Sequence, residues 1–174
     1  MVTAPTISIQ TQKIWNLLNE VYDPEVPVLS VTDLGIVRNV EVQQDDSGQE
    51  QITVTITPTY TGCPAMDVIS MSIRMKLLEH GYRNIQVKSV LSPAWTTDWM
   101  TEAGKQKLKA YGVAPPNPGQ QVCKPDLFQE DEAVQCPRCN SYNTAMVSRF
   151  GSTACKALYK CNDCFEPFDY FKCH

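Results

Sequence analysis

The sequence predicts an α+β protein, in which a small mixed-sheet domain of order α-β-β-α-β-α precedes a metal-bound β zinc-ribbon module. Three observations lead to this fold class. Apolar side chains follow helical and strand periods through the first 112 residues, a proline-rich and acidic segment comes next, and seven of the eight cysteines fall in the last 52 of the 174 residues. The predicted boundaries are 1–112 for the first domain, 113–133 for the linker and 134–174 for the ribbon.

A helix and a β-hairpin open the first domain. Apolar residues at i, i+3, i+4 and i+7 form one face of the helix, namely Ile14, Leu17, Leu18 and Val21. Asp23-Pro24 ends this helix, because a residue before proline avoids the helical region. Residues 34–42 predict a strand, and residues 52–57 predict another, since isoleucine and valine alternate there with threonine. The turn-rich DDSG at 45–48 joins the two strands as a hairpin.

A second helix, a third strand and a last helix complete the domain. The second helix covers residues 64–80 and is capped by Gly81. Its inward-facing residues are Met66, Ile69, Ile73 and Leu77. Residues 85–91 predict the third strand, and residues 97–111 predict the last helix, which Gly112 ends. Helices and strands in this order predict a small mixed sheet covered by helices.

Composition and charge exclude several classes of protein. Hydrophobic residues make up 43% and charged residues 20%, which is the balance of a globular chain. No apolar run approaches the roughly 18 residues that span a bilayer, and residues 1–11 lack the basic and apolar stretches of a secretion signal. We therefore expect a cytoplasmic protein with no membrane partner. The net charge of −4 and a pI near 5.1 argue against a nucleic-acid partner, which requires a basic face.

The C-terminal module carries two CxxC units that predict a zinc site. Cys136 and Cys139 form the first, Cys161 and Cys164 form the second, and 21 residues separate the two units. Two such turns present four thiolates to one ion, and a tetrahedral sulfur shell suits structural Zn²⁺. A module of about 40 residues buries too little apolar surface to fold unaided, so the metal supplies the missing stability.

Three further residues near the ribbon have two interpretations. Cys155 and Cys173 suit buried positions on ribbon strands, as small apolar side chains do. Alternatively, Cys155, Cys173 and His174 form a second metal or iron–sulfur site. No role is assigned to Cys123. The aromatic run is most simply ribbon core, with a partner-binding surface as the alternative, and consists of Phe165, Phe168, Tyr170 and Phe171.

One thiol of the first domain stands at a predicted helix start. In TPTYTGCP (57–64), Pro64 suits the first helical turn, so Cys63 lies at or near the N-cap. The helix dipole at such a position lowers the pKa of a thiol and makes it a better nucleophile or metal ligand. The alternative is an inert cysteine. Acidic residues that could join Cys63 in a metal site, or merely cap turns, are Asp23, Glu25 and Asp33. No catalytic set of residues stands out.

Two groups of motifs resemble known families. The segments VYDPEVPVLSVTDLGIV (21–37) and TPTYTGCP (57–64) resemble the SufT-like iron–sulfur assembly domain, over residues 10–112. The C-terminal half, with WTTDWMTEAGKQKLKAYGVAPP (95–116), CPRC, FGSTACKALYKC and EPFDYFKCH, resembles the PaaD family, the D subunits of bacterial phenylacetyl-CoA epoxidase. The two groups together cover nearly the whole chain.

The resemblance implies a non-catalytic accessory component of the epoxidase that acts in aerobic phenylacetate degradation. Such a component would help to deliver iron or an iron–sulfur cluster to the oxygenase and reductase subunits, because the oxygenase needs iron and the reductase carries an iron–sulfur centre. In the assembly family the cysteine matching Cys63 handles the cluster or metal, and the DPE and DLG motifs map to Asp23, Glu25 and Asp33. The alternatives are an integral scaffold subunit without metal carriage and a thiol-dependent transferase. A homodimer that pairs two Cys63 residues stays open.

Overall fold

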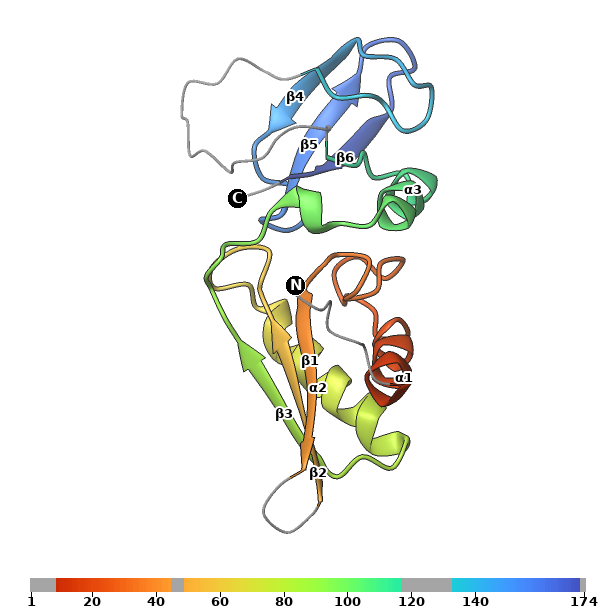
Figure 1. Ribbon diagram of the computed structural model, residues 1–174. Helices are drawn as coiled ribbons and strands as arrows, with labels where there is room; N and C mark the ends of the chain where they lie inside the picture. The colour runs from red at the N-terminus through yellow and green to blue at the C-terminus, as the bar shows by residue number, and fades with distance from the viewer. Residues whose placement is uncertain (1–8, 45–48, 117–132, 173–174) are drawn as a thin grey trace, which may run out of the picture.

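The computed structural model describes residues 9–44, 49–116 and 133–172. Two three-stranded sheets form the framework, one in each half of the chain (Figure 1). The elements are α1 (Ile9–Leu18), β1 (Val37–Gln44), β2 (Glu50–Ile56), α2 (Ala65–Glu79), β3 (Asn84–Ser89), the 3₁₀ helix η1 (Thr97–Trp99), α3 (Glu102–Tyr111), β4 (Thr144–Ser148), β5 (Lys156–Cys161) and β6 (Pro167–Phe171).

The first sheet is mixed, as the sequence predicts. β1 and β2 pair antiparallel as a hairpin, and β3 pairs parallel with β2 after the chain crosses over through α2. The helices α1 and α2 contact each other and this sheet (Figure 1). The second sheet is antiparallel in the order β4-β5-β6 and forms the ribbon. The α+β fold class is therefore confirmed.

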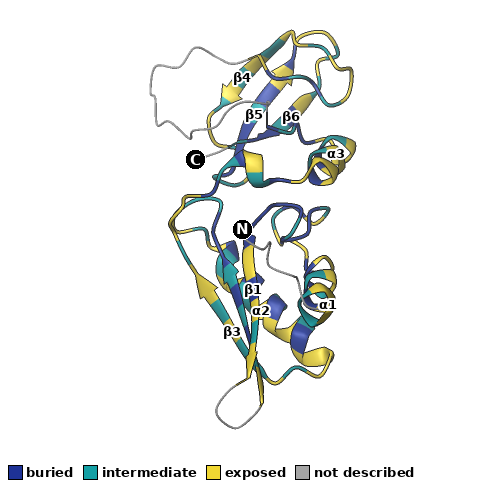
Figure 2. Ribbon diagram, viewed as in Figure 1, coloured by how far each residue is buried: buried dark blue, intermediate teal, exposed yellow. Residues whose placement is uncertain are grey.

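The core of the first domain lies between this sheet and its helices (Figure 2). In β2 the alternating apolar residues are buried and the threonines between them are partly exposed, which is the pattern that period two predicts. On α2, Ile69, Ile73 and Leu77 are buried at four-residue spacing and Met66 is half-buried. Among the described residues no helix is long and apolar enough to cross a membrane.

Several predicted element boundaries are wrong. α1 ends at Leu18, so Val21 lies outside the helix that Asp23-Pro24 is predicted to end. β3 ends at Ser89 and not at residue 91.

Two further boundaries differ for a local reason. The predicted helix 97–111 is divided into η1 and α3, because Thr101 takes an extended conformation and its hydroxyl caps α3 by accepting a hydrogen bond from the Gly104 amide. The strand predicted from residue 34 begins at Val37 instead. Gly35 has a φ of 67° and turns the chain just before β1.

The turn at Gly35 packs closely against the segment that follows β3. The indole Nε1 of Trp95 donates to the Leu34 carbonyl at 2.8 Å. A Cβ on Gly35 would lie 2.2 Å from the carbonyl oxygen of Trp99. Glycine is therefore required at position 35 for two reasons: it adopts the positive φ without strain, and it leaves room for the Trp99 peptide.

The ribbon shares core residues with the first domain. Cys155 and Phe171 are buried in the same apolar cluster as the first-domain helices and strands. The ring of Phe171 meets the Trp95 ring edge-on, with centroids 6.2 Å apart. The start of the predicted linker pairs with β6 through backbone hydrogen bonds. The Ala114 amide donates to the Asp169 carbonyl, and the Phe171 amide donates to the Ala114 carbonyl. Most of that linker, at 117–132, lies outside the described residues.

Alanine substitutions at two glycines test the contact at Gly35. Gly35→Ala and Gly81→Ala both place a Cβ at positive φ, but nothing lies within 4 Å of the second one. The backbone strain costs about 1–2 kcal/mol in each variant. Gly35→Ala also displaces the Trp99 peptide, at a further cost of about 1–3 kcal/mol. Urea unfolding followed by tryptophan fluorescence should show the larger loss for Gly35→Ala, and equal losses would contradict the contact.

Candidate metal-handling sites

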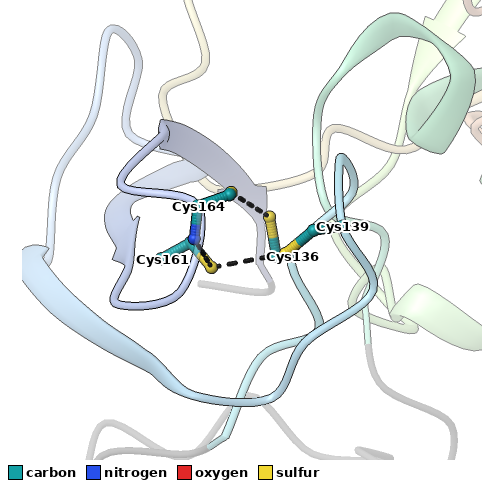
Figure 3. A group of neighbouring side chains, drawn as sticks. All are labelled: Cys136, Cys139, Cys161 and Cys164. Carbon is teal, nitrogen blue, oxygen red and sulfur yellow. Dashed lines mark hydrogen bonds between the residues drawn. The ribbon is translucent and has the colours of Figure 1, made fainter.

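The four cysteines of the two CxxC units converge in the ribbon (Figure 3). Their sulfur atoms all lie within 4.8 Å of one another. The Cys136 and Cys164 sulfurs are 3.7 Å apart, and those of Cys139 and Cys161 are 3.5 Å apart. A tetrahedral ion with Zn–S bonds of about 2.3 Å requires sulfurs about 3.8 Å apart. The cluster therefore has the spacing of a four-thiolate metal site.

Tight turns present these sulfurs. Each CxxC unit is followed by a residue with positive φ, Asn140 at 63° and Phe165 at 61°. In the second turn the Cys164 amide donates to the Cys161 sulfur at 3.5 Å. This hydrogen bond and the one from the Asp163 amide outweigh burial and lower the pKa of Cys161 to about 7, which favours the thiolate that a metal binds.

The expectation that the whole aromatic run is ribbon core is wrong at one residue. Phe168, Tyr170 and Phe171 are buried. Phe165 is 70% exposed, because the turn after Cys164 directs its side chain outward. The ring stands 5.8 Å from the ammonium of Lys160.

Cys63 lies in the loop between β2 and α2, directly before the N-cap residue Pro64. Its thiol is half-buried and is hydrogen-bonded to the Tyr60 side chain. Burial raises the pKa of Cys63, and the charges of Glu25 and Asp23 raise it further, against the lowering effect of the Ala65 amide and Tyr60. The lowered pKa expected from the helix dipole is therefore wrong, since desolvation dominates.

The DPE motif forms a turn that contains Glu25, whose charge acts on Cys63. One carboxylate oxygen of Asp23 accepts hydrogen bonds from the amides of Glu25 and Val26, each at 2.8 Å. Asp23 is 8% exposed, and burial raises its pKa in spite of these bonds and of the charge of Lys156. The buried Asp23 thus fixes the turn, and Glu25 is the more exposed carboxylate.

Cys155 of the ribbon also reaches Glu25. Its thiol donates to the Glu25 carboxylate at 3.7 Å and lies 3.1 Å from the Thr153 hydroxyl. Burial, together with the negative charge of Glu25, raises the pKa of Cys155 to about 11, although the Thr153 hydrogen bond opposes this shift. The neighbouring Lys156 ammonium donates to the Glu25 carbonyl and to Ser152.

Asp33 of the DLG motif makes a separate set of contacts. Its carboxylate accepts hydrogen bonds from Lys107 at 2.6 Å, from the Ser30 amide at 3.1 Å and from the Thr101 hydroxyl at 3.2 Å. Burial opposes ionisation, but Lys107 and Ser30 outweigh it and lower the pKa of Asp33. These contacts join the loop before β1 to α3.

Sequence reasoning missed two members of the Cys63 neighbourhood. Tyr60 stands inside the TPTYTGCP motif, so its position next to Cys63 was a usable signal. No motif near Lys156 in the sequence indicates its contact with Glu25, which is 131 positions away. The residues Cys123, Cys173 and His174 lie outside the described residues. Within 9–44, 49–116 and 133–172, three or more ligand atoms come within 4.8 Å of one another only at the four ribbon cysteines.

The fold and the four-cysteine cluster define a class of protein, an iron–sulfur assembly domain joined to a zinc ribbon. The family model "Iron-sulfur cluster assembly protein" matches residues 11–88, and the model "PaaD zinc beta ribbon domain" matches residues 120–172. A protein of Escherichia coli (strain K12), provisionally named as the D subunit of 1,2-phenylacetyl-CoA epoxidase, is 48% identical over 94% of this chain and 93% of its own length. The chain belongs to the family of these D subunits.

Other relatives match the first domain. An "Fe-S protein maturation auxiliary factor" of Porphyromonas gingivalis is 38% identical over 102 residues, which are 58% of this chain and 92% of that protein. A crystal structure of a domain of unknown function, DUF59, from Bacillus anthracis matches with a TM-score of 0.50 and 26% identity. That match covers 56% of this chain and 89% of the other. The family expected from the sequence motifs is confirmed.

Alkylation kinetics test the environment of Cys63. Because a raised pKa leaves less thiolate at any pH below it, Cys63 should react with iodoacetamide more slowly at neutral pH than an ordinary cysteine, and the pH midpoint of its reaction should lie above that of an ordinary cysteine. Glu25→Gln removes a negative charge and should move the midpoint to lower pH. Tyr60→Phe removes a donor to the thiolate and should move it to higher pH. Mass spectrometry of the Cys63 peptide measures the rates, and a wild-type midpoint below that of an ordinary cysteine would contradict the burial argument.

Proposed function

We propose that this chain is an accessory maturation factor that carries iron or an iron–sulfur cluster on Cys63 to the phenylacetyl-CoA epoxidase system. The observation that carries this proposal is the environment of Cys63. A half-buried thiol lies in a family motif, with a tyrosine hydroxyl hydrogen-bonded to it and two carboxylates whose charges act on it. Soft thiolate and hard carboxylate together suit iron better than either does alone.

Transient binding fits this environment. A permanent iron–sulfur cluster takes four protein ligands, usually thiolates. Among the described residues only the ribbon cysteines bring that many sulfurs together. A site with fewer preset ligands holds its cargo weakly enough to release it. In this proposal Cys63 binds the cargo, Glu25 assists it, Asp23 fixes the turn and Asp33 holds the surrounding loop.

The ribbon has a different task in the proposal. We assign zinc to its four cysteines, because a closed shell of four thiolates is typical of structural Zn²⁺. The zinc stabilises a module too small to fold by its apolar core. Arg138, Lys160 and the exposed Phe165 give this module an outer surface on which a client could dock.

The names of the relatives support the choice of clients. The Escherichia coli relative is named as a subunit of 1,2-phenylacetyl-CoA epoxidase, and the Porphyromonas gingivalis relative as an Fe-S protein maturation auxiliary factor. We infer that the clients are the oxygenase and reductase subunits, and that the chain works without turnover of its own in the reducing cytoplasm. A homodimer that joins two Cys63 thiols is compatible with this proposal.

An integral scaffold subunit is the second candidate. It is favoured by one observation, that the ligand atoms around Cys63 do not converge in the way that the ribbon sulfurs do. A scaffold would remain bound to the oxygenase in fixed proportion and would need no metal on Cys63.

Metal analysis of the full chain separates the two candidates. The chain, Cys63→Ser and Cys161→Ser are purified anaerobically, exposed to ferrous iron and sulfide, desalted, and analysed for zinc, iron and sulfide. We expect about one zinc per chain in the wild type and in Cys63→Ser, and its loss in Cys161→Ser. We expect iron in the wild type and its loss in Cys63→Ser, because that substitution removes the carrying thiol.

A transfer step completes the test. Iron-loaded chain is mixed with the reductase subunit stripped of its cluster, and the return of reductase electron transfer is followed. Recovery with the wild type and none with Cys63→Ser is the expected result. Zinc without iron in both the wild type and Cys63→Ser, with stable co-purification of Cys63→Ser and the oxygenase, would overturn carriage and favour the scaffold.

A further inference from the structure

The proposed function uses Cys63 and leaves a second thiol of the same neighbourhood without a task. We propose that Cys155 is a second thiol ligand for the cargo of Cys63, so that the carrier site is built from both domains, with Glu25 next to both thiols. This inference rests on the proposed function and deepens it. The sequence suggested that Cys155 forms a second site with Cys173 and His174. The inference instead assigns Cys155 to a site at the junction between the two domains.

The contacts of Glu25 carry the inference. Its carboxylate accepts the Cys155 thiol at 3.7 Å, and its charge also acts on Cys63. Tyr60, which is hydrogen-bonded to Cys63, is close enough to Cys155 for the two side chains to interact electrostatically. Cys155 thus contacts Glu25 directly. Cys63 and its partner Tyr60 lie close enough to this pair for the charges to interact.

The hydrogen-bond partners of the Cys155 sulfur are polar, although the residue is also buried in the apolar cluster of the first domain. A cysteine that serves only packing meets apolar side chains, as a small apolar residue would. The Cys155 sulfur has Glu25 and Thr153 as hydrogen-bond partners, although the residue is 5% exposed. A buried thiol next to a carboxylate is the arrangement of a ligand that awaits a cation.

The charges at this junction balance once a divalent cation is bound. Two thiolates and the carboxylates of Glu25 and Asp23, whose charges both act on the thiols, carry four negative charges. Lys156, which is 7% exposed and donates to the Glu25 carbonyl, supplies one positive charge. Lys172, which interacts electrostatically with Cys155, supplies another. A divalent cation supplies the other two, while each thiol releases its proton to solvent on binding.

The Cys63 loop can adjust to a ligand. Gly62 has a φ of 83°, and nothing lies within 4 Å of the position of its absent Cβ. Thr61 and Gly62 are exposed. The inference requires this exposed loop to bring the Cys63 sulfur toward Cys155 when cargo binds, because the two thiols and Glu25 do not all lie within 4.8 Å of one another in the structure.

Cobalt titration of the full, zinc-loaded chain tests the inference. Co²⁺ binds thiolate sites more weakly than Zn²⁺, so it leaves the ribbon metal in place. The charge-transfer absorption per bound Co²⁺ grows with the number of thiolate ligands. We expect Cys155→Ser and Cys63→Ser each to remove about half of this absorption. Each should also weaken Co²⁺ binding by more than about tenfold, since even the loss of a residue that only supports a ligand costs that much.

Two control variants separate ligation from packing. Thr153→Val removes the other hydrogen-bond partner of Cys155 and should leave the absorption per Co²⁺ unchanged. Glu25→Gln should weaken binding without halving the thiolate absorption. In the wild type, Co²⁺ should protect both Cys63 and Cys155 from iodoacetamide, which is read by mass spectrometry and does not depend on the folding of a variant.

The outcomes also distinguish this inference from the proposed function. If Cys155→Ser keeps the full absorption and Co²⁺ protects Cys63 alone, Cys155 is a packing residue. The inference is then overturned, while carriage by Cys63 stands. If Cys63→Ser keeps the full absorption as well, and neither thiol is protected, both the inference and carriage on Cys63 fail.

Discussion

The ribbon places two of its residues, Cys155 and Phe171, in the apolar core of the assembly domain, and the arrangement of the candidate carrier site depends on this junction. Phe171 lies edge-on to Trp95, and Cys155 is buried in the cluster that also contains the first-domain helices. A module of about 40 residues with a small core of its own is stabilised by its metal at one end and by this contact at the other. The junction therefore fixes the position of Cys155, the described ribbon cysteine that lies outside the two CxxC units.

The junction also explains the chemistry around Cys63. Loops are usually solvated, and a thiol before a helix N-terminus would then ionise easily. Here Glu25 lies between the loop and the ribbon, and burial makes ionisation of the neighbouring thiols costly. A thiol that stays protonated until a cation arrives reacts slowly with oxidants and alkylating agents. In the proposed carrier, this protects the empty thiols between one delivery and the next loading.

Local patterns in the sequence predicted the local structure, and tertiary contacts account for the differences. The β2 alternation, the α2 stripe and the two CxxC units depend on neighbours in the chain, so each was predictable. The break at Thr101 depends on a single capping hydroxyl, and the exposure of Phe165 depends on the turn after Cys164. The raised pKa of Cys63 and the contact between Cys155 and Glu25 depend on residues from distant segments, which no periodicity reports.

The two cysteine clusters differ in how much of a ligand shell is preset, and this difference suits two tasks. The ribbon sulfurs already have the spacing of a tetrahedral shell, so little reorganisation opposes binding and the metal stays. Around Glu25 the thiols come from separate domains and must move to meet a cation. Each movement subtracts from the affinity, and a carrier needs that reduction because its clients must be able to remove the cargo. In the proposed mechanism, a permanent metal in the ribbon holds together the module that supplies Cys155 to the temporary site.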